Sequence, residues 1–302
     1  MAIHEQTASF DVVVVGGGFS GVCAAIAAAR EGAKVLLLEA TGALGGMSTM
    51  GMVPAWCPYS DGERIVYGGI AERMLMAGKD ETRFVDPKMV NWVPINPETM
   101  KHLYDDLMVT GKVDVLFGTT VSAVDQEPGK VGTVIVTNKS GLTAYRAKIW
   151  VDCTGDGDLA AYAGAKFELG EDNDPTEVQM ATHCFEIGGV NDETYVKGIR
   201  LHNANPESPI FKIEKDDRYP HITDAHFCNN KIGNGAVGFN AGHLPPFDPT
   251  DPKALSKAYI LGRRKAREVT QALREYYPEA FGNSFLLATA PLMGIRESRR
   301  IV

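Results

Sequence analysis

Three glycines at fixed spacing, Gly16, Gly18 and Gly21, follow a run of valines, and an acidic residue, Glu39, comes later in the chain. Gly16 permits a tight turn, Gly18 lets the backbone approach a pyrophosphate, and Gly21 lets a helix pack closely on a strand. A carboxylate at Glu39 can accept hydrogen bonds from a ribose 2′-hydroxyl. The pattern favours dinucleotide binding over a glycine-rich turn that holds no ligand.

Secondary-structure elements must surround this turn to make it a binding site. Residues 11–15 and 34–38 are nearly continuous Val and Leu runs, typical of parallel strands covered on both faces, and residues 19–31 predict a helix between them. The helix N-terminus would face the phosphates with unpaired N–H groups and the positive end of its dipole. This β-α-β unit predicts an α/β fold with a parallel sheet.

Two further segments carry glycines where a ligand could pass. In the loop at 41–51, the amides of Gly45 and Gly46 can reach a ligand and Ser48 adds a hydroxyl, although a plain flexible loop would be equally rich in glycine. Thr154-Gly155 follows a predicted strand and so lies at the carboxyl end of the sheet, where ligands bind. A simple turn with capping aspartates is the structural alternative for this second segment.

Arginines are concentrated at the end of the sequence, at Arg296, Arg299 and Arg300. A helix here would bring the three guanidinium groups to one side, suited to a carboxylate or an electron-rich ring. A solvated or salt-bridged helix end is the alternative interpretation.

The composition excludes several classes of function. The chain has 302 residues, 38 acidic and 30 basic side chains and a formal net charge of −8, which disfavours general nucleic-acid or anionic-membrane binding. The N-terminus does not have the pattern of a signal peptide, and no apolar run is long enough to span a membrane, so we expect a cytoplasmic protein. Five widely spaced cysteines and scattered histidines predict neither disulfides nor a metal site.

The remaining elements are expected as follows. Asn96-Pro97 should start a helix that Gly111 ends, and short strand-like runs should form a small antiparallel excursion at about 120–148. Further strands are predicted at 178–187 and 225–239, and a helix at 253–277. We expect a first domain at 1–159, a smaller, mostly β substrate domain at 160–250, and a return toward the first domain at 251–302.

Taken together, these motifs resemble the FAD-dependent oxidoreductase family. Within the glutathione-reductase-like flavin folds, the sequence is most similar to the branch near the fumarate reductase and succinate dehydrogenase flavoprotein subunits. The resemblance runs from about residue 10 to residue 302 and implies a Rossmann-like FAD-binding domain. It also implies roles for individual residues: Gly16, Gly18, Phe19, Ser20 and Gly21 at the pyrophosphate, Glu39 and Ala40 at the adenosine ribose, Gly45, Gly46, Met47 and Ser48 beside the ribityl chain and flavin, Val121 at the adenine, and Thr154, Gly155 and Asp156 closing the site.

The same resemblance predicts how FAD is held and what could be missing. Some relatives attach FAD covalently through a histidine in the loop after the acid, but this sequence has no histidine between His4 and His102, so we expect non-covalent FAD. In the family, a further segment that binds the ribityl chain follows the arginine run. We therefore expect that a missing segment or a second polypeptide completes the flavin site; a homo-oligomer is an open alternative.

The sequence thus predicts an oxidoreductase in which a hydride moves between a small organic substrate and FAD. Arg296 is the candidate for the group that polarises the substrate or binds an anion, and Trp56 and Tyr59 are candidate lids. Two alternatives stay open: a non-catalytic nucleotide-binding fragment or subunit, and an NAD-binding protein. Gly45-Gly46 and the Thr154 turn argue against NAD.

Overall fold

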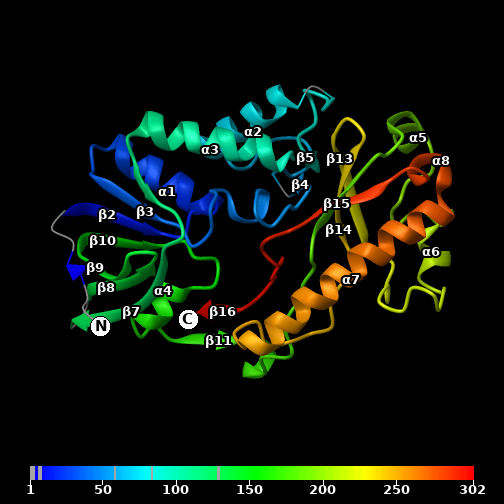
Figure 1. Cartoon of the computed structure of the whole chain (residues 1–302). Helices are drawn as coiled ribbons and strands as arrows, with labels where there is room; N and C mark the ends of the chain where they lie inside the picture. The colour runs from blue at the N-terminus through cyan, green and yellow to red at the C-terminus, as the bar shows by residue number, and fades with distance from the viewer. Residues whose placement is uncertain (1–3, 6–8, 58, 83, 128–129) are drawn as a thin grey trace. The chain divides into compact units, whose positions relative to one another are not determined.

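The computed structural model describes residues 4–5, 9–57, 59–82, 84–127 and 130–302, and it divides into two units. Unit 1 contains residues 1–50, 98–173 and 299–302, and unit 2 contains residues 51–97 and 174–298. Figure 1 labels the helices and strands of both units. The domains expected from the sequence, at 1–159, 160–250 and 251–302, were assigned by function, and their bounds stay a prediction.

A four-stranded parallel sheet organises unit 1, in the order β10-β2-β3-β6 (Figure 1). It is made of β2 (Phe10–Val15), β3 (Val35–Leu38), β6 (Asp114–Leu116) and β10 (Ala147–Asp152). Val15 pairs with Leu38 on one side and with Asp152 on the other, so three strands end level with one another. The predicted α/β fold with a parallel sheet is confirmed, and its carboxyl edge presents the segments that begin at Gly16, Glu39 and Cys153.

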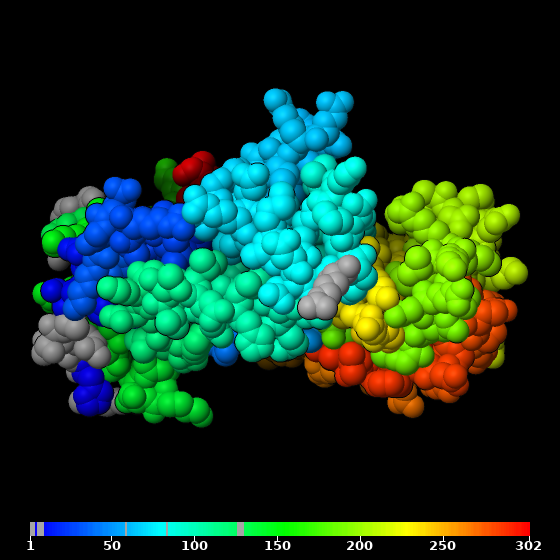
Figure 2. All heavy atoms as spheres, turned by 90° about the horizontal axis from the view of Figure 1, so that it is seen from above, coloured from blue at the N-terminus to red at the C-terminus, as the bar shows by residue number. Residues whose placement is uncertain are grey.

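A second sheet of unit 1 is the antiparallel excursion that the sequence predicted. Its strands β7 (Thr120–Glu127), β8 (Lys130–Asn138) and β9 (Gly141–Tyr145) form a meander, and β1 (His4–Glu5) joins β9 in parallel. Helices α1 (Phe19–Arg30), α3 (Pro97–Gly111) and α4 (Asp158–Tyr162) complete the unit. Figure 2 shows the outer side of α3 at the molecular surface, whereas Met100, Tyr104 and Met108 are buried on its inner side.

Unit 2 is built on an antiparallel sheet in the order β13-β14-β12-β15. The strands are β12 (Phe185–Gly188), β13 (Phe227–Gly233), β14 (Ala236–Ala241) and β15 (Phe285–Thr289). Helix α7 (Pro252–Tyr276) starts at Asp251, whose carboxylate accepts a hydrogen bond from the Lys253 amide. Val269 and Leu273 of α7 and the stacked rings of Phe185 and Phe239 belong to one buried core cluster.

Shorter elements fill the rest of the two units. They are η1 (Gly46–Ser48), β4 (Ala55–Trp56), α2 (Ile70–Glu81), β5 (Val93–Pro94), β11 (Phe167–Leu169), η2 (Glu171–Asn173), α5 (Asp192–Lys197), α6 (Ile210–Ile213), α8 (Pro278–Phe281) and β16 (Arg299–Ile301). Across the described residues, no helix combines the length and the apolar character that crossing a membrane requires.

One prediction about local structure was wrong. The run at 178–187 forms a strand only from Phe185 onward, and Thr182 makes isolated bridges to His243 and Gly294 instead of a continuous ladder. The end of the chain is the strand β16, paired antiparallel with β11, so the helix considered for the terminal arginines does not form. Successive residues of a strand point to opposite faces, so Arg299 and Arg300 cannot present their guanidinium groups together.

Candidate functional site

The glycine turn after β2 is held by close backbone packing. Gly16 has a φ of +95°, and a Cβ placed on it would lie 2.3 Å from the carbonyl oxygen of Cys153. A Cβ on Gly21 would lie 1.8 Å from the carbonyl oxygen of Gly16, so the first turn of α1 packs directly on the end of β2. Both glycines are therefore required by the fold itself, in the roles that the sequence predicted.

Gly18 differs, because nothing among the described residues requires a glycine there. Its backbone is ordinary, with φ −61° and ψ 178°, and a Cβ placed on it would meet no atom within 4 Å. It is the N-cap of α1 without a side-chain cap, and the first turn of the helix carries no acidic residue. The N–H groups at a helix start suit an anion, and the missing side chain leaves room for one. These residues fit the pyrophosphate of a dinucleotide.

Glu39 holds the turn and the following loop together. Its carboxylate accepts hydrogen bonds from the Gly17 amide and the Thr41 amide, each at 2.7 Å, and the residue is 7% exposed. Each carboxylate oxygen has a second lone pair, so these bonds leave acceptor capacity for a ribose hydroxyl. The neighbouring Ala40 is exposed. Glu39 thus has a structural role that the sequence did not predict, beside the ribose role that stays a prediction.

The loop after Glu39 folds back onto the glycine turn. The Gly45 amide donates to the Gly17 carbonyl at 2.8 Å, and Gly18 and Gly45 form a parallel bridge. Gly45 has a φ of +101°, and a Cβ there would lie 2.3 Å from the buried ring of Tyr104 on α3. The buried Ser48 hydroxyl contacts the Tyr104 hydroxyl at 2.8 Å and donates to the Gly45 carbonyl at 2.9 Å. The Ser48 hydroxyl therefore fixes the loop.

Other predicted cofactor residues occupy distinct environments. The Gly46 φ is +53°, Phe19 is half-buried, and Ser20 and Met47 are exposed beside the turn. Val121 is buried on β7, shortly after Thr119, whose amide donates to the Glu39 carbonyl. The segment that leads to Val121 consequently lies against the acid at the end of β3, as an adenine-binding segment would require.

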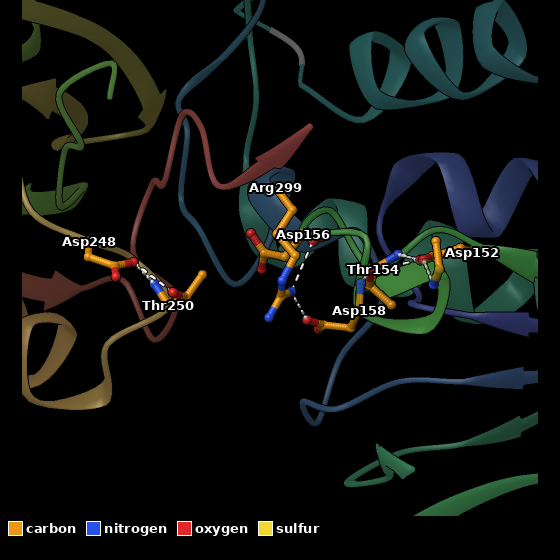
Figure 3. Close-up of polar contacts among 8 residues, drawn as sticks. Asp152, Thr154, Asp156, Asp158, Asp248, Thr250 and Arg299 are labelled. Carbon is orange, nitrogen blue, oxygen red and sulfur yellow. Dashed lines mark hydrogen bonds and ion pairs between the residues drawn. The ribbon is translucent and has the colours of Figure 1, made fainter. Parts of the chain in front are cut away.

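The turn after β10 is organised by Asp152, which the sequence analysis did not single out (Figure 3). One of its oxygens accepts hydrogen bonds from the amide and hydroxyl of Thr154, and the other accepts one from the Ala160 amide at the start of α4. The Thr154 hydroxyl in turn accepts a hydrogen bond from the Asp158 amide. Gly155, with a φ of +84°, is exposed, and a Cβ on it would meet no atom within 4 Å. The turn keeps this glycine open to a ligand.

Arg299 anchors the same turn from β16. Its guanidinium donates to the Asp158 carboxylate at 2.6 Å and to the Asp156 carbonyl at 3.1 Å (Figure 3). Arg300 instead contacts the Glu168 carboxylate and the Gly170 carbonyl, next to the β11–β16 pair. The salt-bridged alternative is therefore the correct one for both arginines, on a strand and not on a helix.

Arg296 belongs to unit 2 and is exposed. It donates long hydrogen bonds of 3.4 Å to the Thr182 hydroxyl and the Asn240 side-chain oxygen. The candidate lids Trp56 and Tyr59 are 7% and 5% exposed, and Tyr59 donates its hydroxyl proton to the Ala71 carbonyl. These aromatic rings pack inside unit 2.

Among the described residues, no group of acids, cysteines and histidines could hold a metal ion.

The chain belongs to the FAD-dependent oxidoreductase family: it matches the family's model over residues 11–302. Its cofactor is FAD. No curated protein matches the sequence.

Solved structures share the fold at low identity. A geranylgeranyl bacteriochlorophyll reductase-like protein from Thermoplasma acidophilum has a TM-score of 0.53 and 16% identity, with coverage of 96% of this chain and 66% of the other. CabE, an aromatic hydroxylase from angucycline biosynthesis, has a TM-score of 0.52 and 16% identity, with 97% and 54% coverage. AlpK has a TM-score of 0.52 and 14% identity, also with 97% and 54% coverage. The chain therefore spans between about half and two thirds of the length of these proteins.

Proposed function

We propose that this chain holds FAD non-covalently across the carboxyl edge of the unit 1 sheet and serves the transfer of a hydride between a small organic substrate and the flavin. The observation that carries the proposal is Gly18: neither backbone strain nor packing within the chain requires glycine there, whereas the pyrophosphate of FAD does. When bound, FAD supplies an electron sink, which the protein side chains lack.

The chain's own groups bind and orient the cofactor. The N-terminus of α1 would bind the pyrophosphate, and Glu39 would accept hydrogen bonds from the adenosine ribose while it braces Gly17 and Thr41. Gly45 and Gly46 would run beside the ribityl chain, and Gly155 would close the site next to the turn that Asp152 fixes. Arg296 would bind or polarise the substrate, because its partners among the described residues are the neutral Thr182 and Asn240, which leaves the guanidinium available to an incoming oxygen.

The experiment mixes the FAD-loaded protein anaerobically with a panel of small alcohols, amines and carboxylic acids. Reduction of the flavin is measured as the loss of its absorbance. We expect at least one class to reduce the flavin and Arg296→Gln to slow that reduction. Arg264→Gln, which changes an exposed arginine of α7, is the matched control. A chain that binds no FAD would refute the proposal, and binding without any reduction by the panel would favour the non-catalytic nucleotide-binding alternative.

A further inference from the structure

Four backbone segments of unit 2 meet at one end of its sheet, where β12 and β13 begin and β14 ends. Thr182 forms isolated bridges with His243 and with Gly294, and the Gly242 amide donates to the His226 carbonyl at 2.7 Å. The side chains of residues that follow or precede these strands are therefore brought together although they are distant in the sequence. Two histidines, one aspartate and one arginine gather here, and the sequence analysis assigned a role only to the arginine.

Asp224 orders both histidines. Its carboxylate accepts hydrogen bonds from the His226 amide at 3.0 Å, from the His243 amide at 3.0 Å and from the His243 Nδ1 at 2.9 Å. Because a carboxylate only accepts, Nδ1 of His243 must carry the proton, and Nε2 of a neutral His243 is left as a base. This is the arrangement in which an acid fixes the tautomer of a catalytic histidine. The His243 side chain is 27% exposed, so a small molecule can reach it.

His226 lies stacked on His243, with ring centroids 4.1 Å apart and an angle of 23° between the rings. Its Nε2 atom is buried and has no hydrogen-bond partner among the described residues. Burial, together with the neighbouring His243 and Arg296, lowers the pKa of His226 to about 4, so the ring is neutral near pH 7. A buried polar atom without a partner is costly, and a bound oxygen or hydroxyl would satisfy it.

Lys265 supports the loop that carries His243. Its side chain extends from α7, is 3% exposed and donates to the His243 carbonyl oxygen. A Cβ on Gly242, which has a φ of +70°, would lie 2.6 Å from the Lys265 side chain. Burial lowers the pKa of Lys265, while Asp224 and Glu268 oppose that shift. The hydrogen bond from Lys265 to the His243 carbonyl therefore ties the His243 loop to α7.

Arg296 supplies the positive charge of the cluster. Its only hydrogen bonds within the described part of the chain are the two of 3.4 Å to Thr182 and Asn240, and it forms no ion pair there. Its charge lowers the pKa of His226 and opposes the burial that raises the pKa of Cys228, so it lies within electrostatic reach of both. A guanidinium bound this loosely, beside the neutral His226 ring, can take a carboxylate in a bidentate pair.

We propose that Asp224, His243 and Arg296, with His226, form a site in unit 2 that binds a small carboxylate and exchanges a proton with it. Arg296 binds the carboxylate, and His243 Nε2 takes the proton from an O–H group of the bound molecule. The O–H bonding pair stays on the oxygen, the Nε2 lone pair forms the new N–H bond, and nothing is oxidised or reduced; the Asp224 carboxylate stabilises the resulting imidazolium. As a substrate site it rests on the proposed function, because removing a hydride from an alcohol also requires a base for the hydroxyl proton.

The first test measures binding of benzoate and acetate to the full chain by NMR, with histidine rings labelled with 15N and 13C. We expect saturable shifts of the His226 and His243 signals with both acids and none with neutral benzamide. Arg296→Gln should weaken binding at least about 10-fold, the loss of one charge-assisted pair. The control Arg264→Gln should not. Equal affinity in Arg296→Gln, or no saturable shift with either acid, would overturn the proposal.

The second test asks whether His243 exchanges a proton. Benzoate has no O–H group to donate, so its calorimetric titration in buffers of different ionisation enthalpy measures the protons that the complex takes up from the buffer, which reports whether His243 acts as a base beside the bound anion. We expect uptake of a fraction of a proton at pH 7 in the native chain, the same uptake in His102→Gln, and none in His243→Gln. His102 is an exposed histidine of α3 and serves as the matched control.

The titratable and charged groups around His243 set the pH dependence of this uptake. They are Asp224, His226, Lys265 and Arg296, with His202 and Glu268 acting at longer range. Uptake that persists in His243→Gln, or benzoate binding without uptake in the native chain, would overturn the assignment of His243 as the base. If His243→Gln does not fold, Asp224→Asn provides the comparison, since it removes the group that orients the ring. Neither titration needs FAD, so failure to bind FAD would refute the proposed function and leave these outcomes readable.

Discussion

Replacement of Gly18 by alanine adds one Cβ atom that should weaken FAD binding and leave the stability of the fold nearly unchanged. The added Cβ would meet no atom of the chain within 4 Å, and the φ of −61° suits any residue. Alanine is a poorer N-cap than glycine but restricts the unfolded chain, and these effects oppose each other at about 0.5–1 kcal/mol each. We therefore expect the free energy of unfolding without cofactor to change by less than about 1 kcal/mol.

The effect on FAD should be much larger. A methyl group at the start of α1 would displace the pyrophosphate from the backbone N–H groups, and losing two charge-assisted hydrogen bonds at about 1.5 kcal/mol each costs about 3 kcal/mol. This corresponds to a rise in Kd of roughly 150-fold. Titration of the apoprotein with FAD, followed by flavin fluorescence, measures the Kd, and urea unfolding of the apoprotein measures the stability.

Gly233→Ala is the matched control, because a Cβ at this β13 residue would make one ordinary contact, 3.8 Å from the Ala236 Cβ. It should leave the FAD affinity unchanged. If Gly18→Ala binds FAD as the native chain does, the helix start is not the pyrophosphate site. If Gly18→Ala instead loses several kcal/mol of stability, glycine is required there by the fold, and the argument from open space is wrong.

Three further changes test the account at other points. Gly16→Ala should destabilise the apoprotein by at least about 2 kcal/mol in urea unfolding, because the φ of +95° and the 2.3 Å approach to the Cys153 carbonyl exclude a Cβ; unchanged stability would refute that packing. Tyr104→Phe should cost about 1 kcal/mol in the same assay by removing the buried contact with the Ser48 hydroxyl, which thermal scans of both proteins would confirm or refute. Since the folded-state pKa of His226 is lowered to about 4 from 6.5, stability present above pH 6.5 should fall by roughly 2 kcal/mol between pH 6.5 and pH 4, after allowance for partial exposure, and His226→Gln should flatten this pH dependence.

Much of unit 1 could be predicted because its signals are local. The Val and Leu runs of β2 and β3, with the glycine turn between them, specify a covered parallel pair within about thirty residues. Asn96-Pro97 and Gly111 bracket α3 as predicted. By contrast, α2 was not predicted, and the pairing of β16 with β11 depends on residues far apart in the sequence, which periodicity does not report.

The site was predictable where a glycine has a conformational or steric reason that is visible in a motif. Tyr104 and Asp152 were missed, since each acts on a loop from a distant helix or a strand end and neither belongs to a recognised pattern. The spacing of the Thr154 turn from Asp152 was a usable signal, because an acid two residues before a threonine often accepts its amide. Asp224, His226 and His243 carried no signal together: only the ends of β13 and β14 bring them into contact.

The most direct test of the central claim is a parallel titration of the purified apoprotein with FAD and with NAD. The account predicts that FAD binds, that its fluorescence is quenched on binding, and that NAD does not compete with it. Denaturation of the protein should release FAD unchanged. Tight binding of NAD without any binding of FAD would contradict the account.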